Sequence, residues 1–348
     1  MVGLGLLVAA GAAVHAALSS SINGPATALQ TADRLTSTPP SSPTPGGLPT
    51  PGPPTPGGPP APIGPPAPIT GCAPRPSACG YPDSTNTGVP AGVTLVSVPG
   101  QARSGLGWEW DDRGFLAVTG DNAVLDGLLV QAPIDVAASN VTIRNTRIIT
   151  TGEGWGVALR HTVNVIIQDS EISSPTATGP QRLLVGIKDI FGDSTGLQVL
   201  RNDISHTSTG VQVDSGLIEG NYIHDLGFTT GDHVNGTTSN GGTRALTIRH
   251  NTIFNSYDQT DAISLFQDFG NQGNRTIEDN LVAGGGYSVY GGGGTQTSFN
   301  IRIANNRFAR LYYPNGGFWG PVAAFQSGGT GNVWSGNIWD DTGSLVSL

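Results

Sequence analysis

The chain has 348 residues, of which only 12% are charged, and its formal net charge is −9. Its 52 glycines exclude a mainly helical fold, because glycine destabilises helix interiors. The acidic balance and the single lysine, Lys188, argue against a nucleic-acid partner, because phosphate binding needs a clustered basic face.

Residues 1–18 lie within an apolar run that ends in small residues around Ala16. This pattern is typical of a secretory signal peptide, although the usual basic residues at its start are missing. We therefore expect either a cleaved signal peptide or an uncleaved membrane anchor. In both cases the protein would be secreted or held at the cell surface, and only this segment would meet a membrane.

Residues 19–71 are rich in Pro, Gly, Ser and Thr, as in "PTPGGLPTPGPPTPGGPPAPIGPPAP". Such a composition cannot bury enough apolar surface to offset the entropy lost when the chain is ordered. We expect a disordered linker with extended, polyproline-like stretches. It would hold the folded part away from a cell surface or wall.

The two cysteines, Cys72 and Cys79, stand at the start of the expected folded region. In an exported protein they favour a disulfide. A zinc ion would be under-coordinated here, because no histidine lies nearby in the sequence. We expect residues 72–120 to form an N-terminal cap that carries the disulfide and covers one end of the fold.

Residues 121–348 contain a repeat in which an apolar anchor is followed three residues later by a polar residue and five residues later by a second apolar residue. The anchors are Ile143, Ile167, Val199, Ile218, Ile248, Ile277, Ile303 and Val333. The polar column is Thr146, Ser170, Asn202, Asn221, Asn251, Asn280 and Asn306, with Gly336 last. The repeat predicts a strand, a sharp left-handed bend and a second strand, with the asparagine amides stacked on one another.

A third short strand precedes each anchor, as in "GVALR" at Gly156 and "VGIKD" at Val185. Three strands per repeat and an anchor spacing of 19 to 32 residues predict an all-β fold, a parallel β-helix. Side chains along a strand alternate between its two faces, so we expect those of Val157 and Leu159 to point into the core. We expect the same of the matching pair of residues in each of the next strands. An amphipathic helical alternative fails, because the period within segments is two.

The outward residues of these first strands provide the candidate site. One column is expected to contain Arg160, Lys188, Asp214 and Thr237, and the column beside it Ala158, Gly186, Gln212, Asn235 and Ser264, with His233 just before it. Neighbouring strands lie about 4.8 Å apart, so these side chains would line one groove. A groove that mixes cationic, acidic and amide groups in a charge-poor chain is a candidate for catalysis, with Gln212 and Asn235 binding the substrate.

The expected chemistry of this groove is proton abstraction next to a carboxylate. Arg160 and Lys188 would neutralise the carboxylate, and Lys188 or His233 would remove the proton, while Asp214 orients Lys188. In the alternative interpretation Arg160, Lys188 and Asp214 form a surface ion-pair ladder of little energetic value, and His233 only caps a loop.

Aspartates near the same face support a second chemistry. Asp232 and Asp261 are candidates for substrate binding, and Asp268 lies near the same face. Two carboxylates at the right separation, Asp214 with Asp232 or Asp261, would serve as acid and base in glycoside hydrolysis. Calcium is a candidate cofactor through Asp232, Asp189 or Asp193, although no ordered ligand spacing appears. The alternative is that each of these aspartates only forms a turn.

The segment "LYYPNGGFWGP" brings four aromatic residues into one loop, among them Tyr313 and Trp319. Sugars stack on exposed aromatic faces, so Tyr313 and Trp319 are candidates for a substrate subsite. The alternative is that this loop packs on the C-terminal end of the solenoid.

The stretches "CGYPDSTNTGVPAGVTL", "GNYIHDLG", "DHVNGTTSNGGTRALTIRHNTI" and "GNIWDDTG" resemble the secreted actinobacterial right-handed parallel β-helix proteins of the pectate-lyase-like superfamily. The resemblance covers nearly everything after Cys72. It implies a scaffold used by polysaccharide lyases, glycoside hydrolases, epimerases and adhesins, with the site on the first sheet. Asn235 stands where relatives often have aspartate, and the "GHG" of polygalacturonases is absent.

Our leading expectation is an exported enzyme that cleaves an acidic polysaccharide by β-elimination. A glycoside hydrolase with paired aspartates is one alternative, and a non-enzymatic, wall-attached glycan-binding solenoid is another. The expected partner is a polysaccharide or cell-wall glycan, and the protein is expected to be a monomer.

Overall fold

The computed structural model describes residues 71–348, which belong to one compact unit. The expected signal peptide or anchor and nearly all of the expected linker lie outside the described residues. Within the described part, no helix is long and apolar enough to cross a membrane. Two short 3-10 helices, η1 (Pro76–Cys79) and η2 (Gly179–Gln181), are its only helical elements.

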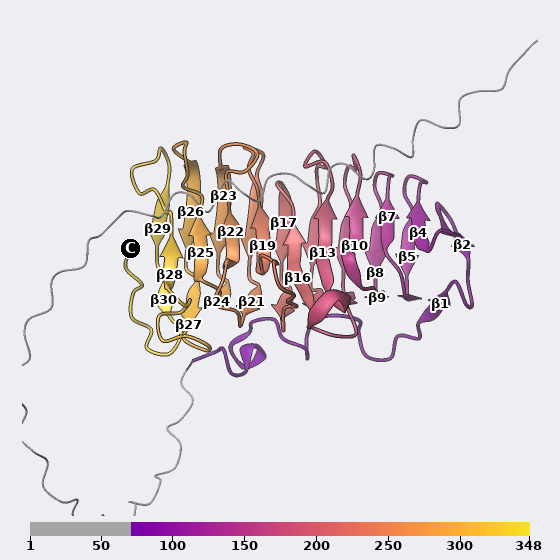
Figure 1. Ribbon diagram of the computed structural model, residues 1–348, viewed down its shortest axis with the longest axis horizontal. Helices are drawn as coiled ribbons and strands as arrows, with labels where there is room; N and C mark the ends of the chain where they lie inside the picture. The colour runs from indigo at the N-terminus through magenta and orange to yellow at the C-terminus, as the bar shows by residue number, and fades with distance from the viewer. Residues whose placement is uncertain (1–70) are drawn as a thin grey trace, which may run out of the picture. The chain divides into compact units, whose positions relative to one another are not determined.

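Three long sheets wind around a common core, and each coil contributes one strand to each sheet (Figure 1). Sheet A contains β1 (Val96–Val98), β6 (Leu128–Val130), β9 (Arg147–Ile149), β12 (Glu171–Ser173), β15 (Asp203–Ser205), β18 (Tyr222–His224), β21 (Thr252–Asn255), β24 (Leu281–Gly284), β27 (Arg307–Ala309) and β30 (Ile338–Trp339). Sheet B contains β2 (Ser104–Gly105), β3 (Trp108–Asp111), β4 (Phe115–Val118), β7 (Ile134–Val136), β10 (Gly152–Leu159), β13 (Leu183–Asp189), β16 (Thr207–Gln212), β19 (Asn235–Ser239), β22 (Asp261–Leu265), β25 (Tyr287–Gly291) and β28 (Gly320–Ala323). Sheet C contains β5 (Val124–Asp126), β8 (Thr142–Arg144), β11 (Ile166–Gln168), β14 (Gln198–Leu200), β17 (Gly216–Glu219), β20 (Leu246–Arg249), β23 (Gly273–Glu278), β26 (Phe299–Ala304) and β29 (Val333–Ser335).

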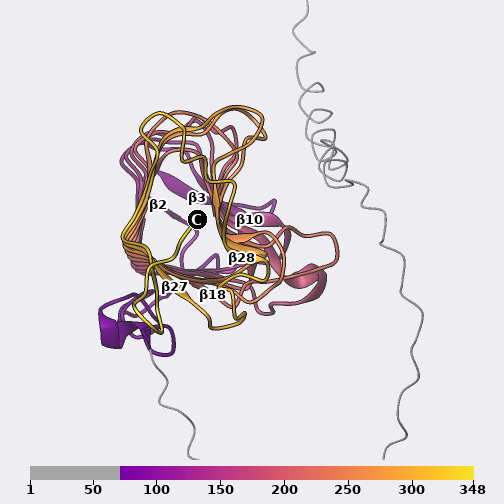
Figure 2. The same cartoon turned by 90° about the vertical axis from the view of Figure 1, so that its left-hand side faces the viewer.

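The prediction of a right-handed parallel β-helix is confirmed. All strand pairs are parallel except β2 with β3 and β3 with β4. Successive coils repeat the order sheet B, sheet C, sheet A, as in β10, β11 and β12 followed by β13. Seen along the solenoid axis, the coils superpose around the core (Figure 2).

The core consists of columns of like side chains. In sheet C, Ile143 pairs with Ile167, and the column continues through the predicted anchors to Ile303, nearly all of which are fully buried. The last anchor differs from the prediction, because Trp334 rather than Val333 pairs with Ile303. Val333 is 38% exposed, so the aromatic ring and not the smaller valine closes this column.

The predicted asparagine ladder is present and fully buried. Asn221 accepts hydrogen bonds from the backbone and side-chain nitrogens of Asn202 at 2.9 and 3.0 Å, and the pattern repeats down to Asn337. The sequence pattern predicts Gly336 as the last member of this column, but Asn337 is the last member. Gly336 is the residue before Asn337, and its backbone is left-handed, with φ 65°. The same left-handed position is held by Arg201 and His250, one residue before their ladder asparagines.

Sheet B owes its close packing to a column of glycines. Gly186 was expected in an outward column, but it is buried, and an added Cβ would lie 2.5 Å from the carbonyl oxygen of Gly210. Its neighbours Val185 and Ile187 are buried, as are Val157 and Leu159 of the preceding coil. No side chain larger than hydrogen fits at position 186 without moving the next coil.

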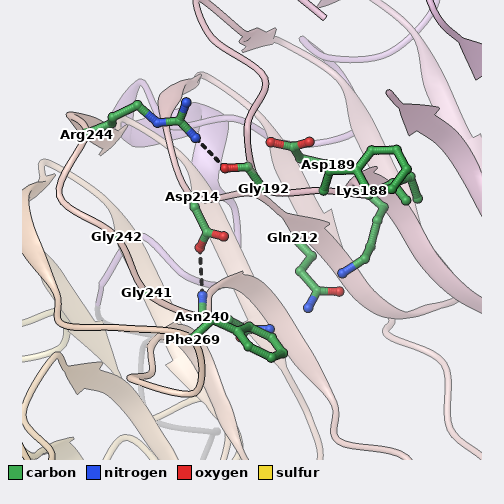
Figure 3. A pocket seen from close by; sticks show the side chains of 12 residues that line it. Lys188, Asp189, Gly192, Gln212, Asp214, Asn240, Gly241, Gly242, Arg244 and Phe269 are labelled. Carbon is green, nitrogen blue, oxygen red and sulfur yellow. Dashed lines mark hydrogen bonds between the residues drawn. The ribbon is translucent and has the colours of Figure 1, made fainter. Parts of the chain in front are cut away.

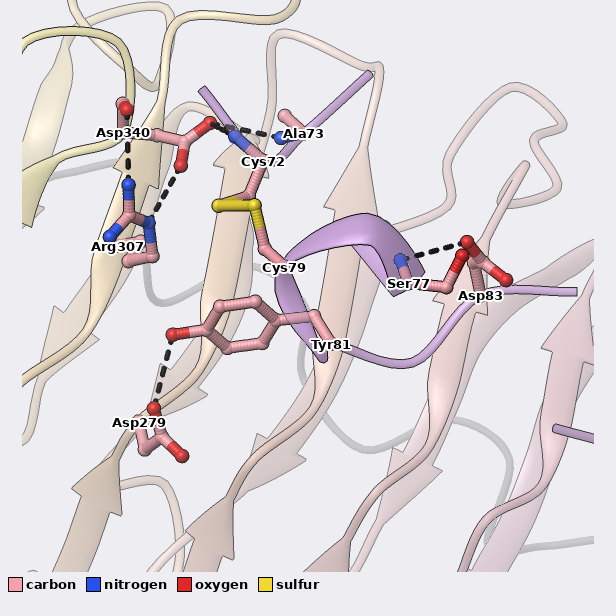
Figure 4. The surroundings of a disulfide bond; sticks show 9 residues. All are labelled: Cys72, Ala73, Ser77, Cys79, Tyr81, Asp83, Asp279, Arg307 and Asp340. Carbon is pink, nitrogen blue, oxygen red and sulfur yellow. Dashed lines mark hydrogen bonds and ion pairs between the residues drawn. A yellow bond between two sulfur atoms is a disulfide. The ribbon is translucent and has the colours of Figure 1, made fainter. Parts of the chain in front are cut away.

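Residues 71–95, which we call the N-terminal strap, run along the outside of sheet A from the last coil to the first (Figures 1 and 4). The backbone nitrogens of Cys72 and Ala73 donate to Asp340 at 2.7 and 2.9 Å. Further along, the Tyr81 hydroxyl donates to Asp279 at 3.0 Å, and the nitrogen of Gly88 donates to the carbonyl of Arg201 at 3.0 Å. The strap therefore touches coils that are far apart in the sequence.

The disulfide between Cys72 and Cys79 is confirmed, and it lies on this strap beside the last coil (Figure 4). Within the segment 72–120 that was expected to cap the fold, only the part from β1 to β4 lies at the first coil. There the antiparallel β2–β3–β4 unit places Trp108 in the core with 8% exposure. At the other end, Val346 is buried, and its carbonyl accepts from Trp334 Nε1 at 3.0 Å.

Candidate functional site

The outward column of sheet B differs in register from the expected one. Lys188 pairs with Ala158 on one side and with Gln212 on the other, and Gln212 pairs with Thr238. Arg160, Asp214 and Thr237 therefore do not share a column with Lys188, and Thr237 is buried between Val211 and Ile263. In this register Gly156 and Gly186 occupy matching places in β10 and β13.

A pocket of about 490 Å³ lies where β13, β16 and β19 end and turn toward sheet C (Figure 3). Lys188 and Gln212 reach it from the strands, and the following turns add the remaining lining residues. Those that matter here are Asp189, Phe191, Asp214, Asn240, Arg244 and Phe269. The structure thus brings together three residues of the expected site, namely Lys188, Gln212 and Asp214.

Lys188 is the half-buried cation of the pocket. Burial lowers the pKa of its amine, and the nearby carboxylates of Asp214 and Asp189 oppose this shift. A lysine with a lowered pKa has more of the neutral amine at a given pH, which is the form that accepts a proton.

Asp214 is held rigidly in the pocket wall. One of its oxygens, Oδ1, accepts from the Ser239 hydroxyl at 2.9 Å and from the Asn240 backbone nitrogen at 2.8 Å (Figure 3). Two charge-neutral donors on one oxygen fix the carboxylate without neutralising it. The negative charge therefore remains available to a cation in the pocket.

Arg275 supports this wall from inside the solenoid. Its side chain is 1% exposed, and its guanidinium donates to the carbonyls of Gly242 and Gly241 at 2.8 and 3.1 Å and to that of Arg244. Desolvation lowers the pKa of Arg275 to about 10, and the Asp214 carboxylate acts in the opposite direction. Sequence reasoning missed Arg275, because nothing in a strand pattern distinguishes a buried arginine from an exposed one.

Arg244 is a second residue that sequence reasoning missed. Its Nη1 donates to the carbonyl of Asp193 at 2.9 Å, and its Nη2 donates to the carbonyl of Gly192 (Figure 3). These bonds place a guanidinium group at the rim of the pocket, where it could neutralise a substrate carboxylate as expected of Arg160. The signal was present as an arginine two residues after the glycine pair of the "SNGG" turn, in "SNGGTR".

Arg160 does not line the pocket. Its Nε lies 2.8 Å from both carboxylate oxygens of Asp135, and both side chains are about one quarter exposed. The structure therefore gives Arg160 a partner on the preceding coil, Asp135, and not a place in a ladder with Lys188 and Asp214.

His233, Asn235 and Asp232 belong to the opposite end of β19. His233 is exposed, whereas Asn235 is 4% exposed and its Oδ1 accepts from the Ser264 hydroxyl at 2.6 Å. Asp232 forms a two-point ion pair with the buried Arg182, at 2.7 and 2.5 Å. None of the three lines the pocket, and the loop before β19 is pinned by Arg182 instead.

Asp261 and the aromatic loop also lie outside the pocket. Asp261 is 2% exposed, contacts the Ser264 hydroxyl at 3.2 Å, and has its pKa raised by burial to about 7. Tyr313 donates its hydroxyl to the carbonyl of Ser256 at 2.8 Å, and Trp319 is 68% exposed with Phe318 edge-on to its ring.

Calcium ligands do not converge in the described part of the chain. Asp189 accepts from the backbone and hydroxyl of Ser194 at 3.0 Å, and Asp193 binds His161 Nδ1 at 2.6 Å. Among residues 71–348 no group of three or more His, Cys, Asp or Glu side chains could hold a metal ion.

Comparison with known proteins found no matching protein-family model, curated protein or solved structure.

Proposed function

We propose that the protein cleaves an acidic polysaccharide by β-elimination at the Lys188 pocket. The observation that carries the proposal is the meeting of Lys188, whose pKa is lowered by burial, with the fixed carboxylate of Asp214 and the rim cation Arg244. A base and a separate cation in one pocket suit a substrate with a carboxylate beside an acidic carbon–hydrogen bond.

The reaction needs no residue beyond these. Arg244 pairs with the uronate carboxylate, which stabilises the negative charge that develops when the adjacent proton leaves. The neutral amine of Lys188 takes this proton. The electron pair of the broken C–H bond forms a carbon–carbon double bond as the glycosidic C–O bond breaks, and the Lys188 ammonium returns its proton to the leaving oxygen.

Gln212 and Asn240 complete the pocket with amide groups that suit sugar hydroxyls. The Asp214 carboxylate raises the pKa of the Lys188 amine and so opposes the lowering caused by burial. In this proposal Arg244 takes the role first expected of Arg160, and His233 has no part in the chemistry.

The pectate-lyase-like superfamily fits this proposal. Support comes from the parallel β-helix and from the sequence stretches described above, including "DHVNGTTSNGGTRALTIRHNTI". The apolar N-terminal run and the Pro-rich segment favour export, so we propose a secreted or cell-surface enzyme that acts on an external glycan. Fold alone does not specify an activity, and the pocket carries the proposal.

A glycan-binding solenoid without catalysis is the second candidate. It is favoured by Trp319 and Phe269, which expose 68% and 84% of their surface. A hydrolase built on Asp261 has less support, because its carboxyl group is buried away from any substrate.

The test is to incubate the full chain with acidic and neutral polysaccharides, and to follow both the ultraviolet absorbance of unsaturated uronates and new reducing ends. We expect both signals to rise on an acidic polymer, and to be lost in Lys188→Ala while Arg160→Ala keeps them. Reducing ends without absorbance would replace elimination with hydrolysis. Binding without either signal would favour the glycan-binding candidate.

A further inference from the structure

Two arginines of the described chain are almost fully buried, and they differ in what balances their charge. Arg182 and Arg275 are each 1% exposed. Arg182 donates directly to the carboxylate of Asp232 at 2.7 Å. Within residues 71–348, by contrast, the hydrogen bonds of the Arg275 guanidinium all go to neutral acceptors. A buried charge is costly unless an opposite charge offsets it, so Arg275 needs a counter-charge that it does not touch directly.

The hydrogen bonds of Arg275 lead to the wall of the pocket. Its Nη2 donates to the carbonyls of Gly242 and Gly241, which line the pocket, at 2.8 and 3.1 Å. Its Nε donates to Gln272 Oε1 at 2.6 Å. Gln272 is fully buried, and its Nε2 donates to the Ser239 hydroxyl at 3.2 Å. A buried polar network therefore runs from Arg275 to Ser239.

Ser239 joins this network to the Asp214 carboxylate. The Ser239 hydroxyl lies 3.4 Å from Arg275 Nη2, and it donates to Asp214 Oδ1 at 2.9 Å. Its single proton points to the carboxylate, because a guanidinium cannot accept a hydrogen bond and the Gln272 amide nitrogen is also a donor. Arg275 and Asp214 are thus opposite charges on the two sides of one buried hydroxyl.

Asp214 also acts on the pocket cation, Lys188. Burial lowers the pKa of the Lys188 amine, and Asp214 is the stronger of the two carboxylates that oppose this shift, the other being Asp189. Asp214 likewise opposes the lowering of the Arg275 pKa by burial. One carboxylate therefore acts on a cation in the pocket and on a cation inside the solenoid. Each cation offsets part of the attraction that this carboxylate exerts on the other.

We propose that Arg275 is a positioning residue that acts through Ser239 and Asp214: it holds the carboxylate in the pocket wall and offsets part of its charge, so that Lys188 keeps a neutral amine. The proposal rests on the proposed function for its effect on catalysis, and it assigns a task to a residue that does not contact the substrate. Without Arg275, the full charge of Asp214 would act on Lys188 and favour the ammonium form, which cannot accept a proton.

The experiment measures the Lys188 pKa in the full chain by nuclear magnetic resonance, in the wild type and in Arg275→Met. We expect the variant to raise this pKa by about 0.5 to 1, which is less than the roughly 1 to 3 that a charge in direct contact causes. Arg182→Met is the matched control, because Arg182 is equally buried but its carboxylate partner, Asp232, lies outside the pocket. This control should leave the Lys188 pKa unchanged.

Ser239→Ala provides a second measurement, because it removes the bridging hydroxyl and keeps both charges. It should also raise the Lys188 pKa, since Asp214 loses a donor that offsets its charge. On an acidic polysaccharide, the pH at which kcat is half-maximal should rise in each variant by the change in its Lys188 pKa. Well below that pH, kcat of Arg275→Met should be about three- to tenfold lower than that of the wild type, since one pKa unit corresponds to a factor of ten.

A Lys188 pKa that falls in Arg275→Met would overturn the proposal, because Arg275 would then only hold Asp214 close to Lys188. An unchanged pKa in both Arg275→Met and Ser239→Ala would also overturn it, because the buried network would not reach the pocket. If Arg275→Met does not fold, Ser239→Ala decides alone. A wild-type chain that cleaves no acidic polysaccharide would reject the proposed function, whereas the pKa measurements would still decide the role of Arg275.

Discussion

Arg182 and Asp232 form an ion pair that is closed to solvent, with side chains 1% and 6% exposed and a closest distance of 2.5 Å. Arg182 also contacts Glu153 at 2.8 Å, but that glutamate is 69% exposed. Arg182 thus has one buried and one exposed carboxylate partner. We expect the two ion pairs to contribute differently to the free energy of unfolding.

We expect Asp232→Asn to lower the free energy of unfolding by about 3–5 kcal/mol, because it leaves the buried Arg182 charge without its partner. Glu153→Gln should cost less than about 1 kcal/mol, as is usual for exposed pairs. Chemical denaturation of both variants measures the difference. Equal effects would contradict the assignment of Asp232 as the structural anchor of the loop before β19.

The buried carboxyl group of Asp261 predicts a pH-dependent stability. Its pKa is raised to about 7 in the folded protein, so the folded state keeps a proton that an unfolded aspartate releases near pH 4. The stability from this group is present below about pH 4 and is lost as the pH rises through 7. The loss amounts to at most about 4 kcal/mol, at 1.36 kcal/mol per pKa unit.

Asp261→Asn should remove this part of the pH dependence, since an amide does not titrate. The measurement is the free energy of unfolding between pH 4 and pH 8 in the wild type and the variant. Asp112→Asn is the control, because the Asp112 side chain is 90% exposed. A variant that keeps the wild-type slope would show that another group causes it.

The single lysine makes the electrostatics of the pocket directly measurable. Reductive methylation with a carbon-13 label marks Lys188 alone among the side chains, and its resonance reports the pKa. We expect a pKa below the usual lysine value of about 10.4, because the amine is partly desolvated.

Asp214→Asn should lower the Lys188 pKa further, since the Asp214 carboxylate favours the ammonium form. Asp135→Asn should leave it unchanged, because Asp135 pairs with Arg160 outside the pocket. A Lys188 pKa that does not respond to Asp214 would remove that carboxylate from the proposed chemistry.

The asparagine ladder is expected to be the most sensitive polar feature of the core. Asn251 accepts from Asn221 and donates to Asn280 and to the carbonyl of Ile218, all within 2.9–3.0 Å. Asn251→Ala should lower the free energy of unfolding by about 2–4 kcal/mol, because it leaves several buried groups without partners. Asn315→Ala, at an exposed position, should change it by less than about 0.5 kcal/mol, and thermal unfolding compares the two.

The core could be predicted because its residues repeat. The Ile143 column continues from coil to coil to Ile303, and the asparagine ladder runs from Asn202 to Asn337, so the sequence carries its own register there. The one exception is the last coil, where a tryptophan and a valine compete for one place and the larger ring is buried more deeply. Repetition of residue type therefore predicts the inside of a solenoid well.

The site was harder to predict, because its residues occur once each. Counting alternate residues predicts Lys188 and Asp214 in one column, but in the sheet Lys188 lies opposite Gln212. Arg244 and Phe269 lie in turns whose paths depend on contacts between coils, such as that of Gly241 with Gly270. Tertiary contacts of this kind leave no periodic signal in the sequence.

The N-terminal strap changes how the solenoid comes apart. Coils that contact only their neighbours can fray one at a time from either end. Here Cys72 and Ala73 are tied to Asp340 in the last coil, and Val96, directly after the strap, donates to the carbonyl of Gly127 near the first coil. A tension applied at residue 71 therefore loads the final coil rather than the first, and the terminal coils must be released from the strap before they can peel away.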